Sequence, residues 1–431
     1  DDLFTYRLAD NNGNIYENGR ITRGKIFDRD GNLLAEMDEK GIIYSEDENV
    51  RRATVHVLGD PKGNISGGAI RLYYGELIGY SAAEGLYAGA DGDETVTLSV
   101  SEKLSVAAME ALGDMKGAAG VVNYKTGEVL CMVSSPSFDP VGNGEDIQPG
   151  AYLNKSISAA YTPGSVFKLV TVAAAMEYLP DLFERDFHCE GEEIIGGGRI
   201  TCISAHGDMK IEDALAKSCN IVFAELADEL GGERLSEHAK KLGFTDSFSF
   251  DSFKTAAGRY DVYPGGTPEL AWSGAGQSTD LVVPAAMLRY VSAIANGGVW
   301  REFTLHKNGS GGEVRLLDAE TAEKIAEMME YNVFLTYGRE NFPGLSIAAK
   351  SGTAEVGGGM EPHAWFVGFS TDEELPLAFA VVCDTNVSAS AGSIAAASSG
   401  QVRMTASLPA RLLMPTTSGC EGLPRIATRS P

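Results

Sequence analysis

The sequence predicts an α/β protein of the α+β type, in which one central sheet is built from both ends of a long segment. Strand patterns occupy residues 117–135, helical patterns dominate from about 160 to 340, and strand patterns return between 345 and 384. Strands, then helices, then strands indicate one layered domain whose first and last strands share a sheet. A smaller β-rich domain, residues 1–95, precedes this segment.

The N-terminal domain is rich in Gly, Asn, Asp and β-branched residues. Its string RGKIFDRDGNLLAE, residues 23–36, predicts two strands joined by a turn at Asp30-Gly31, because this dipeptide between apolar runs is typical of a hairpin. The next pattern predicts a helix over residues 101–112, with Ser101 as its N-cap and apolar residues at helical spacing.

The strongest strand signal follows that helix. AAGVVNY and EVLCMVSS flank Lys125-Thr126-Gly127 and are almost continuously apolar, a pattern typical of strands whose sheet is covered on both faces. Five helical patterns come next, at residues 165–179, 211–230, 233–242, 281–296 and 318–331, and the last strands are predicted at 345–356, 363–369 and 376–384.

Composition excludes several classes of protein. The 431 residues carry a net charge of -25 and are 44% hydrophobic. A sizeable core is therefore expected, whereas nucleic-acid binding is not, because it requires clustered Lys and Arg. No apolar run approaches the roughly 18 residues that span a bilayer. The chain begins at Asp1 without Met, so we expect a processed cytosolic protein or a targeting segment left off this sequence.

Two of the six cysteines, Cys189 and Cys202, stand nearly symmetrically about a glycine run at 196–198. If strands pair around this turn, a disulfide between the two cysteines would close a loop of about 14 residues and contribute about 3 kcal/mol. Such a bond implies an oxidising compartment. Two alternatives stay open: a metal site that combines both thiols with His188 or His206, and two free buried thiols.

The C-terminal residues differ from the rest of the chain. From Thr385 onward they include one acidic residue, Glu421, and are rich in Ser, Ala, Thr and Pro. We expect a disordered tail over residues 393–431. The alternative is a sequence that is not the natural terminus, such as the product of a frame error.

The segment TPGSVFKLVTVAAAMEYL, which starts at Thr162, predicts a helix buried in the core. Ser165 and Lys168 are three residues apart in its first turn and therefore share one face. A serine hydroxyl is a weak nucleophile until a base takes its proton, and a lysine whose pKa is lowered by burial can be that base. Ser165 is the candidate nucleophile and Lys168 the candidate base.

A second motif, Ser218-Cys219-Asn220, lies at a predicted junction of helix and loop. Ser218 would pass protons to a leaving amine, and Asn220 would hold a substrate amide. Cys219 lies between them, with its side chain expected to point away, and is given no chemical role.

A third motif, Lys350-Ser351-Gly352-Thr353, lies on an apolar strand. Lys350 would contribute positive charge, and the hydroxyls of Ser351 and Thr353 would bind a carboxylate. Gly352 would leave room for the substrate backbone. Each short motif alone can occur by chance, but all three occur here, and we expect them to converge on one cleft.

Together these motifs resemble the SxxK, SxN and K[ST]G[T] elements of the class B penicillin-binding proteins, serine D,D-transpeptidases of bacterial cell-wall synthesis. Residues 23–36 resemble that family's N-terminal pedestal. Further similar stretches are TLSVSEKLSVAAMEALGD, GAAGVVNYKTGEVLCMVSSPSFDP, GAGQSTDLVVPAAML and HAWFVGFS. The resemblance covers roughly residues 20–385.

The resemblance implies the penicillin-binding transpeptidase fold, with an antiparallel five-stranded sheet between helical layers over residues 96–392. It also implies a short pedestal, and an oxyanion hole formed by the backbone N–H groups of Ser165 and Thr353. The family's C-terminal helix is not recognisable after Ser393. An N-terminal membrane anchor, absent from this chain, would place the protein at the extracytoplasmic face of the bacterial membrane.

The implied function is cross-linking of peptidoglycan stem peptides through an acyl-enzyme on Ser165, with acylation by β-lactams and a membrane glycan polymerase as partner. We expect no nucleic acid, metal ion or cofactor.

A serine β-lactamase is a rival function. A class A β-lactamase uses a Glu-x-x-x-Asn segment between the second and third motifs, but no Glu is followed four residues later by Asn between 220 and 350. A D,D-carboxypeptidase shares the motifs, and a non-catalytic β-lactam sensor is disfavoured because all three are intact. His206 is expected to be a structural hydrogen bonder.

Overall fold

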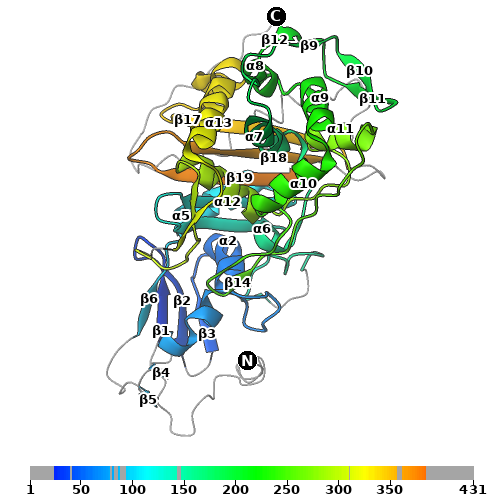
Figure 1. Ribbon diagram of the computed structural model, residues 1–431. Helices are drawn as coiled ribbons and strands as arrows, with labels where there is room; N and C mark the ends of the chain where they lie inside the picture. The colour runs from blue at the N-terminus through cyan, green and yellow to red at the C-terminus, as the bar shows by residue number, and fades with distance from the viewer. Residues whose placement is uncertain are drawn as a thin grey trace, which may run out of the picture.

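The structure, a computed structural model, describes residues 24–38, 41–77, 80–81, 86–87, 94–142, 147–309, 311–356 and 362–384. Figure 1 shows a small β-rich N-terminal part and a larger part in which helices cover a central sheet. The predicted disordered tail and the C-terminal helix sought after Ser393 lie outside these residues. Within the described ranges, no helix combines the length and apolar character that a membrane crossing requires.

The central sheet has five strands, and all neighbouring strands in it are antiparallel. In spatial order they are β17 (Ile347–Ala354), β18 (His363–Ser370), β19 (Leu377–Asp384), β7 (Gly117–Asn123) and β8 (Val129–Ser135). The last of these strands in the chain, β19, pairs with the first, β7, so that Leu377 lies opposite Asn123. The prediction of a sheet built from both ends of one segment is confirmed.

The other elements surround this sheet or form the N-terminal part. The helices are α2 (Glu48–Leu58), α3 (Ala69–Leu72), α4 (Tyr74–Leu77), α5 (Glu102–Leu112), α6 (Lys155–Ser158), α7 (Lys168–Tyr178), α8 (Ile211–Ala216), α9 (Asn220–Leu230), α10 (Gly232–Lys241), α11 (Pro268–Gly274), α12 (Pro284–Ala295) and α13 (Ala319–Asn332). Short 3₁₀ segments are η1 (Gly164–Phe167) and η3 (Arg339–Asn341), and η2 (Val333–Tyr337) is a π-helix.

The remaining strands are short. They are β1 (Gly24–Phe27), β2 (Leu33–Asp38), β3 (Gly41–Tyr44), β4 (Tyr80–Ser81), β5 (Leu86–Tyr87), β6 (Thr95–Thr97), β9 (Phe187–Cys189), β10 (Glu192–Ile195), β11 (Gly198–Thr201), β12 (Gly207–Met209), β13 (Ser249–Phe250), β14 (Phe253–Lys254), β15 (Val299–Arg301) and β16 (Glu313–Arg315).

Alternate residues of the central strands enter two separate cores. On β19, Ala380 and Val382 belong to the core that contains α7 and α12, whereas Phe379 and Val381 belong to the core that contains α5. Successive side chains of a strand point to opposite faces. Helices therefore cover both faces of the sheet (Figure 1), which explains why these strands are almost continuously apolar.

Two predicted helices differ from those observed, both next to proposed site residues. The pattern at 211–230 is divided into α8 and α9 by a break at Ser218, whose φ is 54°. The pattern at 165–179 begins with the 3₁₀ turn η1 and becomes α-helical at Lys168. Apolar residues at helical spacing continue on both sides of each irregularity, so periodicity alone does not reveal them.

The N-terminal part contains a four-stranded sheet in the order β3-β2-β1-β6. Strands β1 and β2 form the antiparallel pair predicted around Asp30-Gly31, and β6 pairs with β1 in parallel. The predicted boundary between residues 95 and 96 falls within β6. That boundary stays a prediction.

Asp28 joins this sheet to the larger part. Its carboxylate is fully buried and accepts hydrogen bonds from the backbone N–H groups of Asp30 and Asn32, and from the side-chain amide of Asn32. It also accepts the backbone N–H of Glu102, the first residue of α5, at 3.1 Å. One carboxylate therefore orders the β1–β2 turn and satisfies a free N–H at the start of a helix on the central sheet.

We expect Asp28→Ala to lower the free energy of unfolding by about 2–4 kcal/mol, because several buried donors lose a charged acceptor. Urea denaturation followed by circular dichroism measures the change. Asp30→Ala is the matched control, since Asp30 lies exposed in the same turn and its loss should cost under about 0.5 kcal/mol. Equal losses in the two variants would contradict the role given to Asp28.

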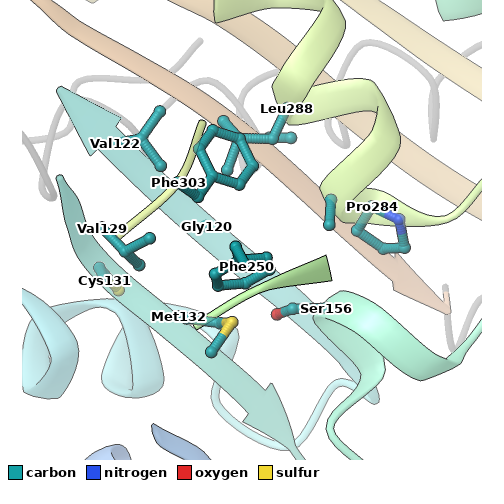
Figure 2. A pocket seen from close by; sticks show the side chains of 12 residues that line it. Gly120, Val122, Val129, Cys131, Met132, Ser156, Phe250, Pro284, Leu288 and Phe303 are labelled. Carbon is teal, nitrogen blue, oxygen red and sulfur yellow. The ribbon is translucent and has the colours of Figure 1, made fainter. Parts of the chain in front are cut away.

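An apolar pocket lies between β7, β8 and the start of α12, and Figure 2 shows Val129, Phe250, Leu288 and Phe303 around it. Its lining is apolar apart from Ser156. No residue of the three sequence motifs lines it. We interpret this pocket as an imperfectly filled part of the core, with the reactive groups elsewhere.

Candidate active site

Ser165 and Lys168 meet at the point where η1 becomes α7. The Nζ atom of Lys168 lies 2.8 Å from Oγ of Ser165. Lys168 is fully buried, whereas Ser165 is partly exposed. The pair therefore consists of a hydroxyl that a substrate can reach and an amine that is shielded from water.

The break between α8 and α9 brings the second motif to the same amine. Nζ of Lys168 donates to Oδ1 of Asn220 at 2.7 Å and to the carbonyl oxygen of Ser218 at 3.1 Å, and it lies 3.3 Å from Oγ of Ser218. A continuous helix would not place both side chains here. The left-handed backbone at Ser218 turns the chain so that Ser218 and Asn220 face Lys168.

Lys350, on β17, also contacts Ser218. Its Nζ atom donates to Oγ of Ser218 at 3.2 Å and to the carbonyl oxygen of Ser351 at 2.9 Å, and its side chain is almost wholly buried. The hydroxyl of Ser218 therefore lies between two lysine amines, from Lys168 and Lys350. Protons can pass along this short chain of groups without bulk water.

Burial sets the charge of both lysines. Loss of water lowers the pKa of Lys168 to about 8, against an opposing effect of Cys202 and Cys219. Burial also lowers the pKa of Lys350 well below its ordinary value, and the nearby charge of Lys168 lowers it further. A pKa of about 8 leaves part of the Lys168 amine neutral near neutral pH, and the neutral amine is the form that a general base requires.

The edge of β17 forms the other side of the site. Thr353 is exposed and Ser351 partly so, and Gln277 donates through Nε2 to the carbonyl oxygen of Thr353 at 3.2 Å. Tyr337, at the end of η2, accepts the backbone N–H of Ser351 at 2.7 Å and donates to its Oγ at 2.8 Å. These contacts hold the strand edge in place while its hydroxyls stay reachable.

Glycines allow η1 to lie directly against β17. A Cβ atom at Gly164 would stand 2.5 Å from the carbonyl oxygen of Thr353, and one at Gly352 would stand 2.8 Å from that of Pro163. Gly164 also has a φ of 57°, which favours glycine. Gly352 was predicted to leave room for the backbone of the substrate. On the side where a Cβ atom of residue 352 would lie, that room is filled by the backbone of Pro163 and of η1.

The structure thus brings together Ser165, Lys168, Ser218, Asn220 and Lys350, and packs the strand that bears Ser351, Gly352 and Thr353 against η1.

Two residues of the site were not predicted from the sequence: Tyr337, and Gln277 with its contact to Thr353. Gln277 lies in the quoted segment GAGQSTDLVVPAAML, which is a signal for it, whereas Tyr337 lies in a π-helix that no periodic pattern marks.

The predicted Cys189–Cys202 disulfide is wrong, since both cysteines are free. The predicted hairpin exists as β10 and β11, but its register pairs Ile195 with Gly198, and the N–H of Cys202 donates to the carbonyl oxygen of Gly191. Cys189 belongs to β9, which pairs with β12 instead. The two cysteines are therefore not cross-strand partners.

A mixed α/β fold with a Ser–Lys pair at the start of a buried helix, and a Lys-Ser-Gly-Thr strand beside it, defines the active-site serine enzymes that recognise penicillin. The profile of the penicillin binding protein transpeptidase domain matches residues 117–402. The chain belongs to this family, and its relatives include class B penicillin-binding proteins.

Stage V sporulation protein D of Bacillus subtilis is 30% identical over 290 residues, which are 62% of this chain and 45% of that protein. Peptidoglycan D,D-transpeptidase PbpA of Mycobacterium tuberculosis is 27% identical over 326 residues, 66% of this chain and 65% of that protein. The chain therefore spans between about half and two thirds of the length of these relatives.

Solved structures share the fold. The ceftriaxone acyl-enzyme complex of penicillin-binding protein A from M. tuberculosis has a TM-score of 0.74 and 23% identity, and the match covers 90% of this chain and 98% of that one. The D,D-transpeptidase domain of a peptidoglycan glycosyltransferase from Eggerthella lenta has a TM-score of 0.70 and 24% identity, over 91% and 98% of the two chains.

Proposed function

We propose that this chain is a serine D,D-transpeptidase that cross-links peptidoglycan stem peptides through an acyl-enzyme on Ser165 and is acylated by β-lactams. One observation carries the proposal: Oγ of Ser165 lies 2.8 Å from the buried amine of Lys168, which also contacts Ser218 and Asn220. The PbpA relative is named a peptidoglycan D,D-transpeptidase, which supports the same reaction.

In the acylation step, Oγ of Ser165 attacks the carbonyl carbon of the penultimate D-alanine, and its proton passes to the neutral Nζ of Lys168. The carbonyl oxygen becomes an oxyanion, for which the backbone N–H groups of Ser165 and Thr353 are the proposed donors. When the tetrahedral intermediate collapses, the C–N bond breaks and the leaving D-alanine amine takes a proton through the hydroxyl of Ser218. An ester on Ser165 results.

In the second step, the amine of a neighbouring stem peptide attacks the ester carbonyl. The amine loses a proton to the hydrogen-bonded groups of Lys168 and Ser218. The ester C–O bond then breaks, and Oγ of Ser165 regains its proton. A new amide is formed and the enzyme is restored. A β-lactam follows the first step only, because its leaving amine stays tethered in the opened ring and occupies the path of the acceptor.

Binding of the substrate changes the charge of Lys350. In the free enzyme its pKa is lowered well below the ordinary value, by burial and by Lys168. A substrate carboxylate held by the hydroxyls of Ser351 and Thr353 would supply the missing negative charge and favour the protonated amine. Lys350 is therefore proposed to carry its positive charge chiefly when the carboxylate is bound.

The proposal extends to the setting of the enzyme. By resemblance to class B penicillin-binding proteins, we infer action at the extracytoplasmic face of the membrane through an N-terminal anchor. We also infer a membrane-embedded glycan polymerase as partner. Co-purification of the full-length protein with such a polymerase would test the second inference.

Mass spectrometry after treatment with benzylpenicillin tests the function. We expect the intact mass to rise by the whole mass of the drug, since ring opening expels no fragment, and the adduct to map to the peptide that contains Ser165. The adduct should persist for minutes. Rapid loss of the adduct with turnover of the drug would instead indicate a β-lactamase, and absence of any adduct would contradict acylation chemistry.

A stem pentapeptide separates the two peptidoglycan reactions. With an amine acceptor present, the proposed transpeptidase should release D-alanine and form a new amide. Release of D-alanine with only hydrolysed product would point to a D,D-carboxypeptidase.

A further inference from the structure

Beside the second motif, four metal-binding side chains converge from separate parts of the chain. Cys189 ends β9, Cys202 follows β11, His206 precedes β12, and Cys219 is the N-cap of α9. Their ligand atoms all lie within 4.8 Å of one another. We call these four residues the Cys3His cluster.

The spacing of the donor atoms matches tetrahedral zinc. With Zn–S near 2.3 Å and Zn–N near 2.0–2.1 Å, a tetrahedral site separates two sulfurs by about 3.8 Å and a sulfur from a nitrogen by about 3.5 Å. The Sγ atoms of Cys202 and Cys219 are 3.7 Å apart, and Sγ of Cys189 is 3.5 Å from Nδ1 of His206. A disulfide requires sulfurs about 2.05 Å apart.

The burial and surroundings of the cluster also suit a metal. Cys189 and Cys219 are buried, and Cys202 and His206 are partly buried. Sγ of Cys202 accepts the backbone N–H of Asn220 at 3.1 Å, a contact that favours a sulfur with negative charge. Among the described residues, the other cysteines, Cys131 and Cys383, lie instead in the core beneath the sheet.

We propose that the thiolates of Cys189, Cys202 and Cys219 and Nδ1 of His206 bind one Zn²⁺ tetrahedrally. Three sulfurs and one imidazole nitrogen form a donor set that selects Zn²⁺. Four protein ligands complete the coordination, so no position stays open for water or substrate, and the site is structural. The expectation of no metal ion, and of a hydrogen-bonding role alone for His206, is replaced by this proposal.

The zinc site would fix the second motif. Cys219 lies between Ser218 and Asn220, and the Nδ2 group of Asn220 donates to the carbonyl oxygen of Thr201 beside Cys202. Ser218 has the left-handed φ of 54°, a conformation that costs free energy and persists only where its surroundings hold it. A metal bound to Cys219 and to the β9–β12 segment would hold this turn against Lys168.

Metal analysis of the purified chain tests the proposal. We expect one zinc ion per chain by plasma mass spectrometry, and cobalt substitution should give the intense visible bands and thiolate charge-transfer absorption of a tetrahedral thiolate site. These two measurements on the unaltered chain do not depend on whether any variant folds. His206→Ala and Cys202→Ser should lose the zinc.

Matched controls come from the same region and the same residue types. His188 lies exposed on β9, where its ring contacts Glu190 and Asp208, and His188→Ala should keep the full zinc content. Cys383→Ala removes a buried thiol from the sheet and should also keep it. Circular dichroism verifies the fold of each variant.

Three results would overturn the proposal. Zinc-free protein in which peptide mapping links Cys202 to Cys219 would replace the metal by a disulfide. Full zinc content in both His206→Ala and Cys202→Ser would place the metal elsewhere. Iron or copper at one equivalent would contradict the assignment of zinc. None of these readouts depends on the proposed transpeptidase activity.

Discussion

Ser165→Ala is expected to abolish covalent labelling by a fluorescent penicillin. The methyl group of alanine has no lone pair to attack the lactam carbonyl. Another hydroxyl in the site, that of Ser218, accepts hydrogen bonds from the amines of Lys168 and Lys350. The fold should be unaffected, because Ser165 is partly exposed and its hydroxyl contacts the amine of Lys168. Gel fluorescence measures labelling, and thermal unfolding verifies the fold.

Ser292→Ala is the matched control for this experiment. Ser292 is a buried helical serine on α12 whose hydroxyl bonds to the carbonyl oxygen of Leu288 in its own helix. This variant should be labelled like the unaltered chain. If Ser165→Ala is folded and still labelled at one equivalent, the nucleophile is another residue and the proposed mechanism fails.

The fold was largely predictable because its strands are buried on both faces. Around Val121 and Phe379, polar residues do not alternate with apolar ones. The continuous apolar runs that contain these two residues locate β7 and β19 directly. The pairing of β19 with β7 follows from the order of the elements and is confirmed. The motif at Ser218 was predicted to lie at a junction of helix and loop, and a break is found there; the left-handed backbone of Ser218 that forms the break was not predicted, since apolar residues continue on both sides of it.

How well the site could be predicted depended on whether its contacting residues are close together or far apart in the sequence. Ser165 and Lys168 are close in sequence, so helical geometry suffices to place them on one face. Lys350 and Ser218 are 132 residues apart, and their motifs, taken as a set, indicated one cleft without giving the distances. The turn between β10 and β11 was predicted, but the register that separates Cys202 from Cys189 depends on backbone pairing, which residue types alone do not determine.

Lys168→Ala is expected to slow acylation by benzylpenicillin by about 10²–10⁴-fold, because the hydroxyl of Ser165 loses its base. Stopped-flow or quenched labelling measures the second-order rate constant. Lys168→Met keeps most of the side-chain volume without the amine, so an equal loss in that variant would assign the effect to the base rather than to a cavity. Near-normal acylation of a folded Lys168→Ala variant would contradict the assigned role.

The pH dependence of acylation separates a base from a merely positioning group. Burial lowers the pKa of Lys168 to about 8, and only the neutral amine can accept the proton of Ser165. Protonation increases as pH falls, so the rate should be maximal above pH 8 and drop about tenfold per unit below it. In Lys168→Ala this dependence should disappear along with most of the rate.

Lys155 offers a matched control for the same profile. Burial lowers its pKa to about 8 as well, but its amine donates to the carbonyl oxygen of Ser135 and not to Ser165. Lys155→Ala should therefore keep both the rate and its dependence on pH. If the decline near pH 8 persists in Lys168→Ala, or vanishes in Lys155→Ala, a group other than Lys168 receives the proton, and the contact between Lys168 and Ser165 positions the nucleophile without activating it.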